Sequence, residues 1–244
     1  MYYYKRTITS GDMVEIEVYK SVRKRNKKNV GRSVNLNLTP EKQKAANELR
    51  AIKEARRTIA NNFIPGDMWL RYSFREDMSE EEADRLVSNY LRRVKYYRQK
   101  HGLSELKYYG VLECGKKGKR WHFHVVMNKI SFEVIEKLWG YGWVALKSLY
   151  SDGQYKDLAK YMRKDEVGKR KIKRSRNLEA PKEKVVELGK RKIKEIESGV
   201  VPEIPEGYYL ADAEHTYNDL TGTSFTFTLL PIAYMALSRA AKKT

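Results

Sequence analysis

At the centre of the chain stands Arg120-Trp121-His122-Phe123-His124-Val125-Val126-Met127, a run of apolar and aromatic residues that predicts a buried β-strand. Because successive side chains of a strand point to opposite faces, His122 and His124 project together while Phe123 turns toward a core. Two imidazoles side by side can hold a metal ion, although a structural polar pair is the more ordinary role of such a pattern.

The segment before this strand supplies a carboxylate. Residues 106–114 predict a second strand, and Gly115-Lys116-Lys117-Gly118-Lys119 is a polar link of hairpin length. The two strands should therefore pair antiparallel and bring Glu113 across from the histidines. Two histidines and one carboxylate suit manganese, iron or zinc, and a site open to phosphate oxygens would also admit magnesium. The alternative for Glu113 is an exposed partner of the flanking lysines.

The order of the surrounding elements predicts the fold class. Residues 68–74 form a strand, and Ser79 with Glu82 forms a capping box that opens a helix to about residue 101. The two central strands follow, then a helix over residues 131–140, a strand over 143–149 and a short helix over 154–166. The order β-α-β-β-α-β predicts an α+β, ferredoxin-like fold, in which helices pack on a central antiparallel sheet.

Further elements are predicted on either side. Residues 1–9 and 14–20 form a basic hairpin, and Thr39-Pro40-Glu41 begins a helix to about residue 61. Beyond residue 166 we expect a basic helix over 181–197, a hairpin from 208–217 and 224–230, and a terminal helix. The predicted segments are an N-terminal extension (1–61), the domain with the candidate site (62–166) and a basic C-terminal extension (167–244).

Charge indicates the partner. The chain of 244 residues has 50 Lys and Arg against 31 Asp and Glu, a formal net charge of +19, so a polyanion is the natural ligand. A cluster after the short helix suits phosphate contacts, with a solvated loop as the alternative: Lys169, Arg170, Lys171, Lys173, Arg174 and Arg176. One cysteine allows no intramolecular disulfide, and no apolar run reaches membrane-spanning length, so we expect a cytoplasmic protein without a membrane partner.

The short helix carries a candidate nucleophile. Leu158 and Met162 mark its apolar face, while Tyr161 and Lys164, three residues apart, share a flank. A phenol with a pKa of about 10 is a poor nucleophile at neutral pH, and a nearby cation and metal would both favour the phenolate. The alternative is an ordinary half-buried tyrosine, one of eighteen in the chain.

Together these motifs resemble those of HUH endonucleases, specifically the rolling-circle replication initiator (Rep) proteins of small plasmids and single-stranded DNA phages, including the filamentous-phage type. The histidine-hydrophobe-histidine motif stands as His122-Phe123-His124, its acidic ligand as Glu113, and the Tyr-x-x-Lys motif as Tyr161-Met162-Arg163-Lys164. The first-strand motif is matched loosely by residues 69–74, which lack the usual threonines. The resemblance covers residues 62–166, and more weakly residues 31–63.

The resemblance implies a mechanism. Glu113, His122 and His124 would hold Mn²⁺ or Mg²⁺ on a scissile phosphate of single-stranded DNA at a replication origin, where the DNA can form a hairpin. Tyr161 would attack that phosphate and leave a 5′-phosphotyrosyl link and a free 3′-hydroxyl for a host polymerase. Lys164 would stabilise the phenolate or orient the phosphate. The chain has no Gly-x4-Gly-Lys-Ser/Thr phosphate loop, so a host helicase would unwind the DNA.

Two alternatives stay open. A non-catalytic nucleic-acid-binding protein on the same ferredoxin-like topology would explain the charge and the tyrosines. A relaxase or a single-strand transposase would use the same metal and tyrosine chemistry. The tyrosine of relaxases usually precedes the histidine motif, whereas here it follows, and the small transposases are usually shorter.

Overall fold

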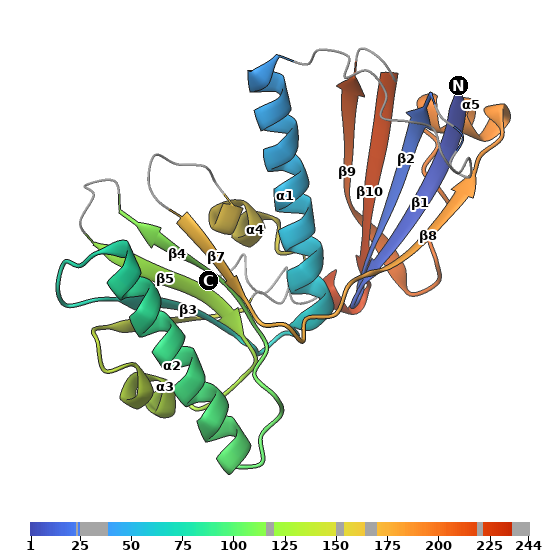
Figure 1. Ribbon diagram of the computed structural model, residues 1–244. Coiled ribbons are helices and arrows are strands. Elements are labelled where there is room, and N and C mark those ends of the chain that lie inside the picture. The colour runs from blue at the N-terminus through green and yellow to red at the C-terminus, as the bar shows by residue number, and fades with distance from the viewer. Residues whose placement is uncertain are drawn as a thin grey trace. The chain divides into compact units, whose positions relative to one another are not determined.

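The computed structural model describes residues 1–22, 24, 39–115, 120–149, 154–163, 170–218 and 222–235. The chain divides into two compact units (Figure 1). The terminal unit comprises residues 1–47, 152–154 and 180–244, and the central unit comprises residues 48–151 and 155–179.

The central unit contains a five-stranded antiparallel sheet in the order β6-β3-β5-β4-β7. Its strands are β3 (Met68–Ser73), β4 (Tyr108–Cys114), β5 (Trp121–Met127), β6 (Val144–Ser148) and β7 (Arg170–Arg174), and its helices include α2 (Glu80–Lys100), α3 (Phe132–Trp139) and α4 (Lys156–Arg163). From β3 to β6 the elements follow the predicted β-α-β-β-α-β order. The α+β, ferredoxin-like prediction is therefore confirmed. The edge strand β7 extends this sheet beyond the predicted unit.

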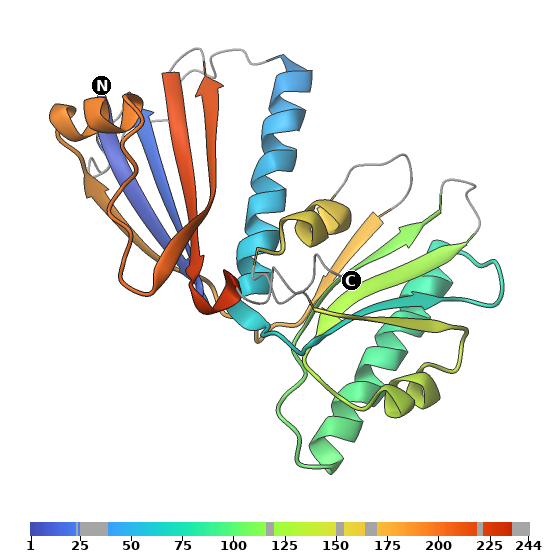
Figure 2. The same cartoon turned by 180° about the vertical axis from the view of Figure 1, so that it is seen from behind.

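The core of the central unit lies between the sheet and the helices α2 and α3 (Figures 1 and 2). Alternate residues of the strands point into it, and α2 and α3 contribute one apolar face each. Its fully buried side chains include Leu70, Tyr72, Val87, Tyr90, Leu112, Phe123, Ile135 and Trp139. Burying each large apolar side chain contributes roughly 1.5–3 kcal/mol. This core therefore stabilises the sheet, and the other face of the sheet remains available for polar side chains.

Local signals set the ends of the helices. The Ser79 side chain accepts a hydrogen bond from the Glu82 backbone N–H (3.2 Å) at the start of α2, as the capping motif predicts. Gly140 ends α3 with a φ of 67°, a conformation that favours glycine. At the start of α1 (Pro40–Asn62), Thr39 Oγ1 accepts from the Lys42 N–H at 3.4 Å.

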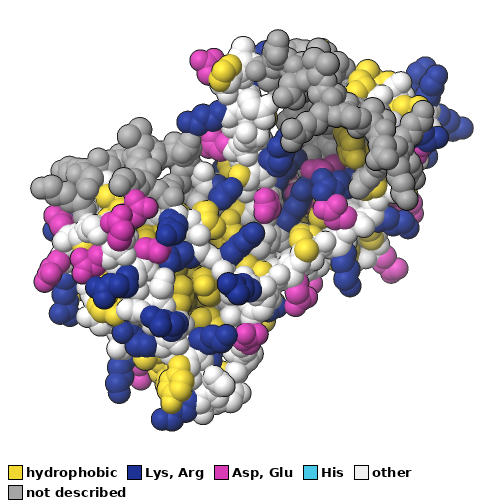
Figure 3. Space-filling model, viewed as in Figure 1, with side chains coloured by type: hydrophobic (Ala, Val, Ile, Leu, Met, Phe, Trp, Pro, Cys, Tyr) yellow, Lys and Arg dark blue, Asp and Glu magenta, His cyan; other side chains and the backbone are white. Residues whose placement is uncertain are grey.

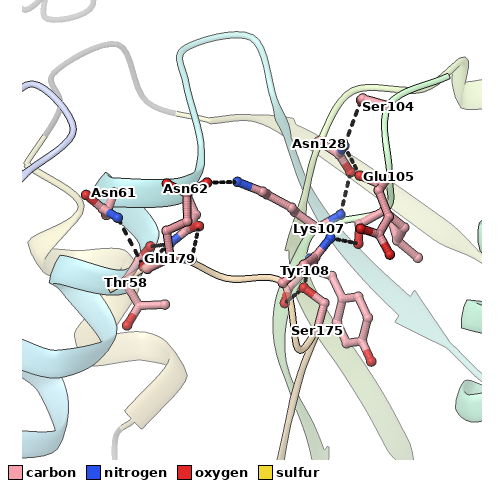
Figure 4. A network of polar contacts seen from close by, with 12 residues as sticks. Thr58, Asn61, Asn62, Ser104, Glu105, Lys107, Tyr108, Asn128, Ser175 and Glu179 are labelled. Atoms are coloured by element: carbon pink, nitrogen blue, oxygen red, sulfur yellow. Dashed lines mark hydrogen bonds and ion pairs between the residues drawn. The ribbon is translucent and has the colours of Figure 1, made fainter. Parts of the chain in front are cut away.

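A polar network around Glu179 ties the segment after β7 to the end of α1 (Figure 4). The Asn62 side chain accepts from the Glu179 N–H (2.8 Å) and donates to the Glu179 carbonyl (2.9 Å). Lys107 Nζ lies 3.0 Å from Glu179 Oε1, and the Lys107 N–H donates to Asn128 Oδ1 at 3.0 Å. The network thus links α1, the start of β4, the end of β5 and the segment after β7.

The terminal unit contains a second antiparallel sheet in the order β8-β1-β2-β10-β9. Its elements are β1 (Tyr2–Ser10), β2 (Met13–Ser21), β8 (Lys182–Glu187), α5 (Lys190–Glu197), β9 (Tyr208–Asn218) and β10 (Gly222–Pro231). Both predicted hairpins, β1–β2 and β9–β10, are confirmed. Ile193 and Ile196 of α5 pack on the sheet against Ile16, Val18, Phe227 and Leu229.

The predicted helix over residues 181–197 is wrong in its first half. Lys182–Glu187 forms β8, which pairs with β1, and only Lys190–Glu197 forms a helix. Gly189 separates the two at the N-cap of α5 with extended backbone (φ −71°, ψ 154°). Lys and Glu favour helices in isolation, but the open edge of β1 offers backbone partners, and Arg6 forms an ion pair with Glu183.

The two predicted extensions meet in the terminal sheet. β1 and β2 come from the segment 1–61, whereas β8, β9 and β10 come from the segment 167–244. Part of each extension also belongs to the central unit, because that unit includes β7 and the part of α1 from residue 48 onward. Most of the predicted terminal helix lies outside the described residues. Within the described ranges, no helix is both long enough and apolar enough to cross a bilayer.

Candidate active site

Three neighbouring strands bring polar side chains to the face of the central sheet that points away from α2 and α3. Glu113 of β4 lies directly opposite His122 of β5, and His122 lies directly opposite Ser73 of β3. His124 has Arg71 of β3 as its cross-strand neighbour. Directly opposed residues of antiparallel strands share a face, so the acid and both histidines lie on one face, as the hairpin prediction requires.

His124 makes the central contacts of the site. Its Nε2 lies 3.1 Å from Glu113 Oε1, and the side chains of His124 and Glu113 are 3% and 18% exposed. The hydroxyl of Tyr161 lies 3.0 Å from the same Nε2 and 3.3 Å from Nδ1. Because water has little access to this imidazole, its polar contacts are stronger than they would be on an open surface.

The helix α4 places Tyr161 over the sheet. Leu158 and Met162 are buried, as their spacing predicts, and they fix the helix on this face. The ring of Tyr161 meets the ring of His124 edge-on (centroids 4.9 Å apart) and lies 6.0 Å from the ring of Trp69. Tyr161 nevertheless remains 39% exposed, so its side chain is partly open to solvent.

His122 faces other partners. Its Nε2 lies 3.5 Å from an Arg71 guanidinium nitrogen and its Nδ1 lies 3.3 Å from Ser73 Oγ, while its ring centroid is 6.3 Å from that of His124. Burial, followed by the positive charge of Arg71, lowers the pKa of His122 below its ordinary value. The imidazole is thus neutral at neutral pH, the form in which histidine binds metals.

Carboxylate and imidazole side chains, which are donor types of metal sites, lie together on this face. Two ligands bonded to one ion at about 2.1 Å and at roughly right angles lie about 3 Å apart, which matches the distance between Glu113 and His124. His122 points toward Arg71 and Ser73 instead, and the described residues contain no set of three or more His, Cys, Asp or Glu side chains arranged to hold an ion. The donor types therefore fit a divalent ion. His122, which faces Arg71 and Ser73, does not join Glu113 and His124 as a third ligand in this structure.

Two predicted residues, Lys164 and Lys169, lie outside the described residues. For Arg170 only the backbone is described, and it pairs with Glu113 on β4. Tyr155 precedes α4 with a φ of 48° and is only 4% exposed, in contrast to Tyr161.

The remaining basic residues predicted to contact DNA lie on or just after β7. Lys171 and Lys173 form ion pairs with Asp84 of α2, at 2.9 and 2.6 Å. Arg174 lies 3.7 Å from Glu54, and Arg176 is exposed. Lys171 and Lys173 of the predicted basic run therefore anchor β7 to α2.

Motif analysis did not assign site roles to Arg71, Ser73 or Trp69. All three occupy alternate positions of β3, on the face that carries the histidines. The topology of a β-α-β-β-α-β unit places its first strand beside its third. The alternating residues 69, 71 and 73 of β3 could therefore have been predicted to lie beside the histidines.

Residues 67–166 match the model of a family described as replication-associated protein ORF2. This segment extends from the start of β3 past the end of α4 and includes Glu113, His122, His124 and Tyr161. No curated protein and no solved structure matches the chain. The predicted resemblance to replication initiator proteins is confirmed for this region.

Proposed function

We propose that this chain nicks single-stranded DNA at a replication origin and thereby initiates rolling-circle replication. The contact between Tyr161 and His124 carries the proposal, because it holds a partly exposed phenol against a buried histidine that also contacts the Glu113 carboxylate. The match of the surrounding segment to a family of replication-associated proteins supports it.

In the proposed reaction, the oxygen of Tyr161 attacks the scissile phosphorus, and the bond from phosphorus to the 3′-oxygen breaks. The phenol loses its proton to water, to which the 39% exposed Tyr161 has access, and the departing 3′-oxygen takes up a proton. The products are a 5′-phosphotyrosyl link and a free 3′-hydroxyl. One phosphoester replaces another, so a later attack by a 3′-hydroxyl can reseal a strand at the same site.

Glu113, His122 and His124 would hold a divalent ion, Mn²⁺ or Mg²⁺, at this face. When bound, such an ion withdraws negative charge from the non-bridging phosphate oxygens. The 3.1 Å spacing of Glu113 and His124 is compatible with two ligands of one ion, and the lowered pKa of His122 favours its ligating form. Lys164, three residues after Tyr161, would stabilise the phenolate or orient the phosphate.

Other proteins would complete the replication cycle. A host polymerase would extend the free 3′-hydroxyl, and a host helicase would unwind the duplex, since the sequence has no phosphate-binding loop of its own. We expect the reaction in the cytoplasm of a bacterial host.

A pair of tyrosine variants tests the proposal. The protein is incubated with Mn²⁺ and a labelled single-stranded oligonucleotide from the origin of its own replicon, and a denaturing gel then shows any covalent adduct. We expect an adduct with the wild type and with Tyr155→Phe, and none with Tyr161→Phe or in the presence of a chelator. An adduct with Tyr161→Phe would overturn the assignment of the nucleophile. DNA binding without any adduct in the wild type would favour a non-catalytic DNA-binding protein.

A further inference from the structure

A pocket of about 510 Å³ lies between α2 and the end of β7, on the side of the central sheet opposite to Tyr161. We propose that this pocket binds an unpaired nucleotide of single-stranded DNA. The proposal rests on the nicking function above, because it assigns a second binding site to the same DNA strand. The contacts of Lys173 with Asp84 and Ser88 of α2 place the pocket on the α2 side.

The floor of the pocket is apolar and aromatic. Leu91 and Leu106 are 7% and 5% exposed, and the half-buried Tyr108 lies beside them. Figure 3 shows apolar side chains in this region bordered by lysine and arginine side chains. Such a floor suits the face of a nucleobase, because stacking on an aromatic ring tolerates any base.

The rim of the pocket is positively charged. Its exposed cations are Arg92 and Lys95 on α2 and Arg174 and Arg176 at the end of β7. Glu105 is the one acidic residue that lines it, and its ion pair with Lys95 (3.7 Å) joins side chains that are 63% and 64% exposed, so it is weak. Within the described part of the chain, Arg92 and Arg176 have no acidic partner. Both are available to bind phosphates.

The shape of the pocket favours a single strand over a duplex. A concave site of this volume falls within the range of about 300–1,000 Å³ that small-ligand pockets occupy. A base must leave its stack to enter it, which an unpaired strand permits at low cost.

The edge strand β7 provides a charged route between the two faces of the sheet. Lys171 and Lys173 contact Asp84 on the α2 side, whereas Arg174, at the end of the strand, lies opposite Tyr109 in register and also lines the pocket. A strand bound at Tyr161 that passes around the end of β7 would therefore meet Arg174 before it reaches the pocket.

Two DNA lengths separate this pocket from the nicking site. Labelled oligothymidine of about 20 nucleotides can reach both sites. A short probe of about 5 nucleotides reports on binding at the nicking site without spanning to the pocket. In the full chain carrying Tyr161→Phe, we expect Arg92→Ala/Arg176→Ala to weaken binding of the long oligonucleotide about tenfold. The slope of log affinity against log salt should fall by about 1.4, since each contact to a single-strand phosphate contributes about 0.7. The matched control is Arg85→Ala/Lys100→Ala, which removes two exposed cations of α2 outside the pocket.

A base-specific signal completes the test. A long oligonucleotide with 2-aminopurine should lose fluorescence on binding as that base stacks on Tyr108, and Tyr108→Leu should abolish the loss while keeping the pocket apolar. Equal affinity and salt slope in the pocket and control variants, or quenching that survives Tyr108→Leu, would overturn the proposal. The pocket variant should bind the short probe as the control does, and a loss of short-probe binding in the pocket variant would also overturn the proposal. If the wild type forms no covalent adduct but these pocket effects persist, the nicking function fails and the nucleotide site stands.

Discussion

Tyr161 and His124 are 37 residues apart in the sequence, yet the phenol oxygen of one lies 3.0 Å from Nε2 of the other. The contact joins the short helix α4 to β5, the middle strand of the central sheet. Since α4 is fixed by the buried Leu158 and Met162, packing positions the phenol. The contact is therefore held by regular structure, which positions side chains more accurately than loops do.

Replacing Glu113 with glutamine should weaken metal binding. The change keeps the size of the side chain and removes the negative charge beside His124. We expect Mn²⁺ affinity, measured by calorimetry, to fall at least about tenfold, and adduct formation to require correspondingly more Mn²⁺. Glu133→Gln, at an exposed position of α3, is the control and should leave both unchanged. An unaltered Mn²⁺ titration in Glu113→Gln would remove this carboxylate from the proposed ligand set.

Replacing Arg71 with alanine should raise the pKa of His122. The guanidinium lies 3.5 Å from His122 Nε2, and its positive charge opposes protonation of the ring. Without it the pKa should move back toward the ordinary value of about 6.5, while burial still holds it somewhat lower. An NMR titration of the histidine side chains measures the shift, with Arg75→Ala as a control on the same chain segment. The electrostatic account fails if the pKa of His122 stays constant or falls in Arg71→Ala.

Asp84→Asn should lower the stability of the central unit at neutral pH. Burial disfavours the charged carboxylate, but hydrogen bonds from Lys173 and Lys171 outweigh it and hold the pKa of Asp84 below its ordinary value. A lowered pKa contributes stability above the unfolded-state pKa of about 4, and that contribution is lost as the pH falls through the folded-state value. We expect a loss of about 1 kcal/mol at pH 7 by urea denaturation, and a smaller difference from the wild type in strong acid.

The exposed Glu82→Gln, whose partner Arg85 lies 3.5 Å away, should change stability by less than Asp84→Asn. A wild-type and Asp84→Asn difference that grows in acid would contradict the assigned sign.

Gly142→Ala should disrupt the start of β6. A Cβ at Gly142 would lie 2.0 Å from the Ser73 carbonyl oxygen, and the next residue, Trp143, exchanges two backbone hydrogen bonds with Ser73. The backbone must shift to relieve the clash, so we expect a loss of about 2 kcal/mol in the free energy of unfolding. Gly189→Ala, where nothing lies within 4 Å of an added Cβ, should cost clearly less, because the weaker N-cap is offset by the reduced freedom of the unfolded chain. Equal stabilities of the two variants would show that the chain at Gly142 moves aside freely.

Local signals in the sequence predicted most of the central unit. Ser79 caps α2, Gly140 ends α3, and the short polar link between two apolar runs correctly pairs β4 with β5. From that pairing, the alternation of side chains along a strand predicts that Glu113 lies on the same face as the histidines. These features depend on neighbours within a few residues or on adjacent strands, so the sequence records them directly.

Contacts between distant segments were harder to predict. Lys171 reads as a phosphate contact until its partner Asp84, 87 residues earlier, is known. The strand β8 reads as helix because its pairing with β1 depends on residues at the other end of the chain, such as Tyr4 opposite Glu187. Arg71 was likewise missed, since its approach to His122 follows from the neighbouring strand.

The terminal sheet has a consequence for synthesis of the protein. The strands β1 and β2 leave the ribosome before every described element of the central unit, whereas their partners β8 and β10 leave it afterwards. The central unit can therefore fold on the nascent chain while β1 still presents an unpaired edge. The contact between the phenol and His124 can thus form before the terminal sheet is complete.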